Sequence, residues 1–192
     1  MIKLTPPEIM MRLLRRTGTV LALLAELLAC ASALQAQLKS NVAAVNLNAL
    51  LNSSLTVAAA PGLVNFALAP NGVASGSSTI TITTSWVLPA SAGNVTLYAF
   101  FNSAAVALAN GAGNNIPSSK VRGSVNGGPF TPFTGSSPFA VGSSITVFKE
   151  SVANTQGNNN RDDLLNLQID TTGLGLPPGT YTGLLRIQAQ AI

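Results

Sequence analysis

Apolar and polar residues alternate with a period of two along much of this chain, which is typical of β-strands that bury one face. The clearest run spans 79–88, where Trp86 shares a face with isoleucines and the opposite face carries threonines and a serine. Shorter runs of the same kind span 45–49, 55–59, 64–68, 95–101, 121–125, 145–152, 165–169 and 185–191. Turn residues separate them, and Asn126-Gly127 is the strongest hairpin signal.

This pattern predicts an all-β fold: an antiparallel β-sandwich of about eight to ten short strands. We expect one sandwich domain over residues 37–192, because turn signals are frequent and no clear amphipathic helix interrupts them. The segment 104–109 fits either a strand or a short helix. Residues 154–161 are polar, and we predict a loop there.

Residues 1–36 differ in character from the rest and predict a secretory signal peptide helix. A basic start precedes an apolar run over 20–29, which Glu26 interrupts. Ala31-Ser32-Ala33 fits the small-residue cleavage pattern, and Leu34-Gln35-Ala36 is a second site. The apolar run is shorter than the roughly 20 residues that cross a bilayer, so we expect no transmembrane segment in the mature chain.

Two variants of export remain open. Arg15-Arg16 forms a twin-arginine pair, but Thr17-Gly18-Thr19 follows where apolar residues are expected. Leu27-Leu28-Ala29-Cys30 resembles a lipobox, which would make Cys30 a lipidated N-terminus and the protein a lipoprotein. We expect an exported protein of the periplasm, the cell surface or the extracellular space, with the lipoprotein as the alternative.

The chain has no histidine and one cysteine, which lies in the predicted signal peptide. The mature chain therefore cannot form a disulfide, a Cys/His metal site or a His-based catalytic triad. Beyond residue 36, six basic side chains face four acidic ones without any basic cluster, so nucleic-acid binding is not expected. We predict a non-enzymatic protein with no catalytic residues, no metal site and no cofactor.

The few acidic residues are the remaining candidates for chemistry. Glu150 is expected on a solvated face or as a charge that protects an edge strand, and Asp170 is expected to face outward. Asparagine and aspartate oxygens over 158–163 could ligate calcium, although their spacing fits no EF-hand loop. The preferred interpretation is a hairpin loop in which aspartate caps the turn and Arg161 pairs with a carboxylate.

Three aromatic residues, Tyr98, Phe100 and Phe148, fall opposite the apolar faces of their strands. Exposed aromatics side by side on a sheet can stack on sugars, so a carbohydrate-binding surface is one hypothesis. The alternative is that the second sheet or loops cover both faces of these strands.

The C-terminal region carries a family resemblance. Tyr181 follows the corner Leu176-Pro177-Pro178-Gly179-Thr180, as in the tyrosine corner of Ig-like sandwiches, which stands at the start of the second-to-last strand. Together with the alternating run 165–170 and the strand ending at 191, this stretch resembles BACON-type Ig-like modules of secreted bacterial proteins. It is also similar to the end of spore coat protein U-like pilin subunits of chaperone–usher systems.

The two resemblances imply different assemblies. In BACON-type modules a further strand follows, whereas a pilin subunit ends about here and leaves a groove that a neighbour's N-terminal strand fills. The segment Val45-Leu47-Ala49 is the candidate donor, in trans or within its own domain. This chain lacks the cysteine pair that such subunits often carry, and its penultimate residue is Ala191 rather than an aromatic.

The main functional expectation is an exported, non-enzymatic Ig-like sandwich with a structural or adhesive role. Its alternatives are a pilin-like subunit that assembles by donor-strand addition and a carbohydrate-binding module. Expected partners are copies of itself or other surface proteins through edge strands, and glycans.

Overall fold

The computed structural model describes residues 42–155 and 157–192. The chain divides into two units, Met1–Ala49 and Leu50–Ile192. In the first unit, the described residues 42–49 form neither helix nor strand and every side chain is exposed, so the strand expected at 45–49 is not formed there. The signal peptide helix predicted for 1–36 lies outside the described residues.

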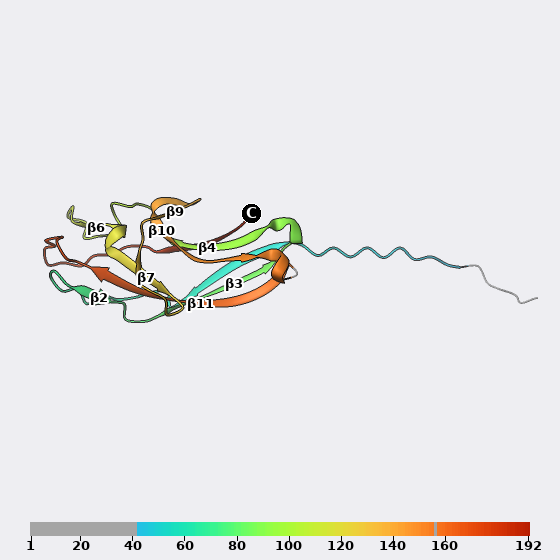
Figure 1. The fold of residues 1–192 in the computed structure, drawn as a ribbon, viewed down its shortest axis with the longest axis horizontal. Helices are drawn as coiled ribbons and strands as arrows, with labels where there is room; N and C mark the ends of the chain where they lie inside the picture. Colours follow the sequence, from blue (N-terminus) through green and yellow to red (C-terminus); the bar gives the residue numbers. More distant parts are fainter. Residues whose placement is uncertain (1–41, 156) are drawn as a thin grey trace, which may run out of the picture. The chain divides into compact units, whose positions relative to one another are not determined.

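The second unit is all-β, and all its strand pairs are antiparallel (Figure 1). The larger sheet has the order β1 (Ser54–Ala60), β3 (Ile80–Val87), β11 (Asn158–Asp170), β7 (Val121–Val125) and β8 (Thr131–Pro132), with β2 (Val73–Ser75) also paired to β11. The smaller sheet has the order β12 (Arg186–Ala191), β4 (Asn94–Phe100), β10 (Ala140–Ser151) and β9 (Gly135–Ser137). A separate hairpin joins β5 (Leu108–Ala109) to β6 (Asn115–Ile116). Three short 3-10 helices, η2 (Ala90–Ala92), η3 (Ser118–Lys120) and η4 (Val152–Thr155), complete the described elements.

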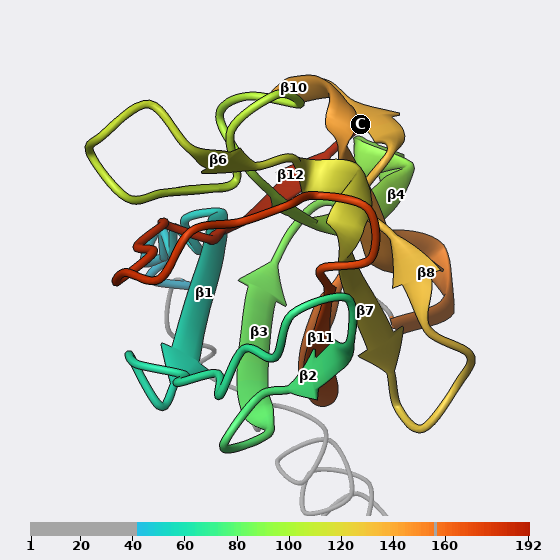
Figure 2. The ribbon, with the colours of Figure 1, turned by 90° about the vertical axis from the view of Figure 1, so that its left-hand side faces the viewer.

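One hydrophobic core draws side chains from both sheets. Ile82 and Trp86 enter it from β3, and Val95 and Leu97 enter it from β4, all at most 1% exposed. Trp86 stacks on Phe148 of β10 with ring centroids 6.0 Å apart. The alternating burial predicted for 79–88 is therefore confirmed, and Figure 2 shows β1, β3 and β11 side by side in one layer.

The two sides of this two-layered structure end differently. On one side the chain passes directly from β8 to β9, and Phe133 between them is fully buried. On the other side lie β1 and β12, each hydrogen-bonded to a single neighbouring strand within the described chain. Both sides therefore end in two edge strands, but β8 and β9 are short and directly connected, whereas β1 and β12 are longer.

The structure confirms one local prediction and corrects three others. The hairpin at Asn126-Gly127 is confirmed, with φ of 51° and 75° at these residues. The loop predicted over 154–161 is wrong in its second half, because β11 begins at Asn158. The strand predicted over 64–68 is reduced to one bridge between Phe66 and Gly76. Of 104–109, only β5 is strand.

Polar cross-strand bonds explain why the Asn158–Asp163 run is a strand. Its outward residues bond to β3, with Thr83 donating to Asp162 at 2.5 Å and Ser85 donating to Asn160 at 3.2 Å. Its inward residues alternate with these and find partners inside the domain. No helix in the described part of the chain has the length and apolar character of a membrane span.

Candidate functional site

An apolar groove lies beside the two edge strands of the second unit. Its volume is about 590 Å³. Core residues Ile80, Phe101, Val121 and Ile169 line it together with two flanking chain segments, 59–68 and 179–187. No charged side chain is among its lining residues, all of which belong to the described chain.

The C-terminal wall of the groove is held in place by specific contacts. The Tyr181 hydroxyl donates to the Pro177 carbonyl oxygen at 3.1 Å. Thr182 and Ala109 exchange two backbone hydrogen bonds of 2.9 Å. A Cβ at Gly183 would collide with the carbonyl oxygen of Ala107, so only glycine permits this close approach. The wall before β12 is therefore positioned without being part of the four-stranded sheet.

The N-terminal wall follows β1 and is anchored to residues 76 and 77. Phe66 bridges Gly76, and the Ser77 hydroxyl accepts a hydrogen bond from the Asn65 backbone at 3.0 Å. Val64, Phe66 and Leu68 are half-buried and pack on the core. Their apolar surface stays partly exposed, as does that of Leu185 and Ile187 on the opposite wall.

This arrangement suits an extended peptide. Each edge strand carries a row of backbone N–H and C=O groups on the side away from its neighbour. A strand laid in the groove could pair with such an edge while alternate side chains enter the apolar floor. The resemblance to pilin subunits led us to expect a groove filled by a neighbour's strand. It did not identify 59–68 as the opposite wall, although the alternating run 64–68 had been predicted as a strand.

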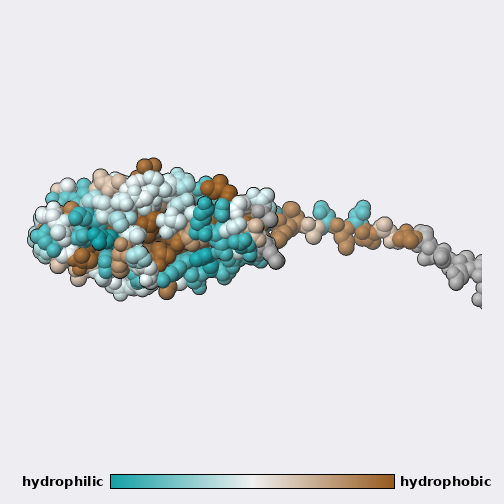
Figure 3. Space-filling model, viewed as in Figure 1, coloured by the Kyte–Doolittle hydropathy of each residue, from teal (hydrophilic) through white to brown (hydrophobic). Residues whose placement is uncertain are grey.

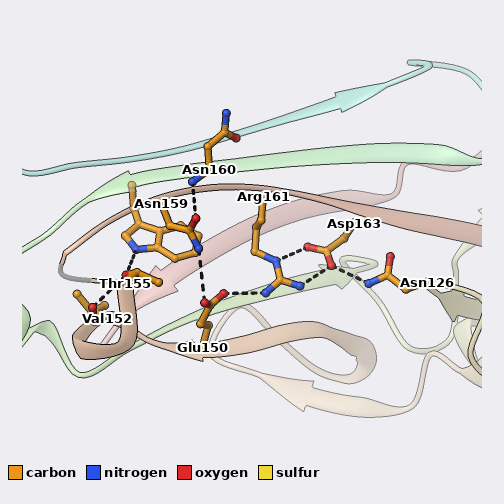
Figure 4. A network of polar contacts seen from close by, with 9 residues as sticks. Asn126, Glu150, Val152, Thr155, Asn159, Asn160, Arg161 and Asp163 are labelled. Carbon is orange, nitrogen blue, oxygen red and sulfur yellow. Dashed lines mark hydrogen bonds and ion pairs between the residues drawn. The ribbon is translucent and has the colours of Figure 1, made fainter.

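A second arrangement of interest is the Arg161 cluster, formed by Arg161, Glu150, Asp163, Asn126 and Phe148. Figure 4 shows its four polar members. Arg161 donates to both oxygens of Asp163 at 2.9 and 2.7 Å and to Glu150 at 2.7 Å. Asn126 donates to Asp163 at 2.8 Å. The guanidinium carbon lies 4.1 Å from the centre of the Phe148 ring, which is cation–π geometry.

This cluster stabilises the fold. The hydrogen bonds to Asp163, together with Glu150 and partly offset by burial, raise the pKa of Arg161 above its ordinary value. Asp163 is fully buried, so its charge requires these partners. The cluster joins β11 of the larger sheet to β10 of the smaller one.

The predictions for these residues are resolved in part. The pairing of Arg161 with a carboxylate is confirmed, although in a strand rather than in a loop. The expectation of a solvated Glu150 is wrong, because its side chain is partly buried and bonds Arg161. The edge-strand expectation agrees with the register, since β9 pairs with β10 only at Ala140 and Ser144 and Glu150 pairs with β4 alone. The calcium alternative finds no support in this geometry, since Asp162 and Asp163 project to opposite faces of β11. In the described residues, no three acidic, histidine or cysteine side chains gather as a metal-binding group.

Asp170 is bound locally. Arg122 pairs with it at 3.1 Å, and the Thr172 amide donates to it at 3.0 Å. The hydrogen bonds from Thr172 hold the pKa of Asp170 below its ordinary value. It stands on the outer side of the larger sheet, away from the groove.

The predicted row of exposed aromatics is mostly wrong. Phe100 and Phe148 are 4% and 7% exposed, because Phe139 stacks on Phe100 at 5.6 Å and Trp86 covers Phe148. The alternative, that both faces are covered, holds for these two. Tyr98 stays partly exposed, with Phe139 at its edge at 6.0 Å.

Comparison with protein-family models, with curated proteins and with solved structures finds no match for this chain.

Proposed function

We propose that this protein is an exported, non-catalytic Ig-like sandwich that builds surface assemblies by strand addition. In this proposal, residues 42–51 of one copy occupy the groove of the next. The observation that carries it is the apolar groove beside two edge strands. This choice takes up the pilin-like alternative and sharpens the broader expectation of a structural or adhesive role.

Two features support the Ig-like assignment. The hydroxyl of Tyr181 bonds a backbone carbonyl four residues upstream, as in a tyrosine corner. The order β1-β3-β11-β7 corresponds to the A-B-E-D sheet of Ig domains, and β12 beside β4 corresponds to strands F and C.

The proposed occupant fits the groove in pattern and length. Val45, Leu47, Ala49 and Leu51 alternate with Asn46, Asn48 and Leu50. Figure 3 shows this segment as mostly hydrophobic with two hydrophilic residues. Eight residues, 44–51, extend about 26 Å as a strand. The wall from 180 to 187 has the same number of residues.

A second copy suits this role better than the chain's own segment. Leu50 and Leu51, which belong to the same unit as the groove, are 85% and 81% exposed. A segment folded back on β1 would bury these side chains. Without a partner, 42–51 leaves a row of large apolar side chains in water, and burying each is worth about 1.5–3 kcal/mol.

The short link between the donor segment and its own domain determines in which direction the donor strand would run along the groove. Only Asn52 and Ser53 separate Leu51 from β1. Ser54 pairs with Val87 at the end of the domain that also holds Ile192, whereas Thr180 and Leu68 line the groove toward the opposite end. A two-residue link can connect domains only if Leu51 lies near Thr180. The donor would then run antiparallel to β12, and domains would follow one another head to tail.

Mixing two singly substituted chains tests the trans arrangement. One chain carries Asn48→Cys and the other carries Leu184→Cys, both with Cys30→Ser. Both side chains would lie on the outer face of the added strand pair. We expect a disulfide-linked dimer only in the mixture. A doubly substituted chain that forms an internal disulfide at all dilutions would instead place the segment in its own groove.

Light scattering after size-exclusion chromatography measures the assembly itself. Leu47→Asp should abolish concentration-dependent oligomers, because a charge cannot enter an apolar groove unpaired. The matched control Asn46→Asp places the same charge on the outer face and should preserve them. A wild-type protein that stays monomeric at high concentration would overturn the proposal.

A further inference from the structure

The outer face of the smaller sheet carries the two cations that no other group engages in the described chain. Five basic residues are described beyond the masked start. Arg161 and Arg122 form ion pairs, and Lys120 donates to the Thr172 carbonyl oxygen at 2.7 Å. Lys149 of β10 and Arg186 of β12 have no ion pair among the described residues, and both are exposed.

Strand register places these cations around Tyr98. On the two neighbouring strands, Gln188 and Thr146 stand directly beside Tyr98. Arg186 pairs with Phe100 one row away, and Lys149 pairs with Thr96 one row away in the other direction. Strand spacing and rise put Lys149 and Arg186 on the order of 16 Å apart, with Tyr98 between them.

Packing against neighbouring aromatic rings holds the Tyr98 ring in place. Phe139 stacks on Phe100 with an interplanar angle of 24° and meets Tyr98 edge-on at 77°. Phe100 is buried beneath it. Tyr98 therefore presents a ring supported on one side and open toward Gln188 and Thr146, both of which are exposed. Little side-chain entropy remains to be lost when a ligand packs against it.

The carboxylates lie elsewhere. Glu150 and Asp163 bond Arg161, Asp162 faces β3 on the other sheet, and Asp170 bonds Arg122. The outer face of the smaller sheet is thus positive, with amide and hydroxyl groups between its two charges. Its charge complements an anion that also offers hydroxyl groups and an apolar face.

We propose that this face binds an acidic polysaccharide, a chain of sugars that bear carboxylates. The C–H face of a sugar ring would pack on Tyr98, and its hydroxyls would bond Gln188 and Thr146. Carboxylates on sugars to either side would meet Arg186 and Lys149. The spacing of the cations suits an oligosaccharide rather than a single sugar. Two separated charges do not form the dense basic cluster that a nucleic acid or an anionic membrane requires.

The probe for the test is polygalacturonate, with dextran as its uncharged counterpart, and binding to the purified full chain is measured by titration calorimetry. We expect polygalacturonate to bind and dextran to bind at least about tenfold more weakly, since a hydrogen bond to a charged group is typically worth that factor or more. Lys149→Gln and Arg186→Gln should each weaken binding about tenfold. Arg122→Gln removes the same charge from the larger sheet and should leave binding unchanged.

Tyr98→Leu separates sugar recognition from simple charge attraction, because it keeps an apolar side chain under Phe139. It should weaken binding several-fold while the melting temperature stays close to wild type. Equal binding of duplex DNA or phosphatidylglycerol vesicles, or no effect of Tyr98→Leu, would overturn the proposal. Leu47→Asp should leave polygalacturonate affinity per chain unchanged, so this inference stands or falls independently of strand addition.

Discussion

The Arg161 cluster and the groove lie in the same domain but differ in whether their side chains and backbone groups find partners within the chain. In the cluster, the charges of Arg161, Glu150 and Asp163 find their partners within the chain. In the groove, half-buried apolar side chains and the outer edges of β1 and β12 lack such partners in the described chain. The first region is complete as a single molecule, whereas the second would be completed by the strand addition that we propose.

The two sides of the domain also differ in how they protect their sheet edges. Natural proteins protect sheet edges with charges, prolines or short strands. The side at β8 and β9 follows this rule, since both strands are short and Pro132 ends one of them. The groove side breaks it, with a six-residue β12 and an apolar wall before it. An unprotected edge beside a hydrophobic surface is expected where a strand is to be added.

The largest expected contrast compares two leucines. Leu165 is fully buried in the closed core, whereas Leu185 is half-buried in the groove wall. Leu165→Ala should lower the free energy of unfolding by about 4 kcal/mol, because it leaves a cavity. Leu185→Ala should cost about 1 kcal/mol in the dilute, unassembled chain, in proportion to its partial burial. Urea denaturation followed by tryptophan fluorescence measures both.

Equal costs for the two leucines would mean that the groove wall is as tightly packed as the core, and the comparison would fail. Measuring the unfolding free energy of Leu185→Ala again under assembling conditions makes the comparison sharper. If a donor strand covers Leu185, the cost of the substitution should rise toward that of Leu165→Ala.

The next effect concerns the ion pairs. Arg161→Ala should lower the free energy of unfolding by about 3 kcal/mol, because it leaves the buried Asp163 without its charged partner. Arg122→Ala is the matched control, since Arg122 is 44% exposed in its ion pair and such pairs are worth about 0–1 kcal/mol. Thermal and urea unfolding of both variants provide the comparison. Similar losses would contradict a special role for the Arg161 cluster.

The smallest effect is a pH dependence at Asp170. Its pKa is lowered in the folded protein by hydrogen bonds from Thr172, so the folded state binds this proton less readily than the unfolded chain does. The stabilisation is therefore present above the unfolded pKa of about 3.9 and is lost as the pH falls through the lower folded value. Asp170→Asn should reduce the acid sensitivity of the melting temperature below about pH 4 and leave its slope near neutral pH unchanged. An unchanged acid limb in this variant would contradict the assignment.

The alternation of apolar residues was sufficient to predict the all-β fold and the buried face of β3. It failed for the stretch from Asn158 to Asp163, because polar residues in series usually indicate a loop. Cross-strand hydrogen bonds from Thr83 and Ser85, together with Arg161 between Glu150 and Asp163, make a strand of this composition stable. Such bonds depend on pairing between distant segments, which a local pattern does not contain.

The candidate sites were predictable to different degrees. The corner before Tyr181 could be read from the sequence, because its hydrogen bond joins residues only four positions apart. The opposite wall at 64–68 and the covering of Phe100 by Phe139 depend on loop paths. The positive face around Tyr98 requires the register of three strands, which places Arg186 and Lys149 on rows either side of it.

The two-residue link of Asn52 and Ser53 has a mechanical consequence. In a filament built as proposed, a pulling force would pass from one domain through this link into a strand aligned with its direction. Strands loaded along their length resist in shear, so many backbone hydrogen bonds must break together rather than one after another. A link this short also leaves little slack, and the filament should behave as a stiff rod under tension rather than as a chain of loosely hinged beads.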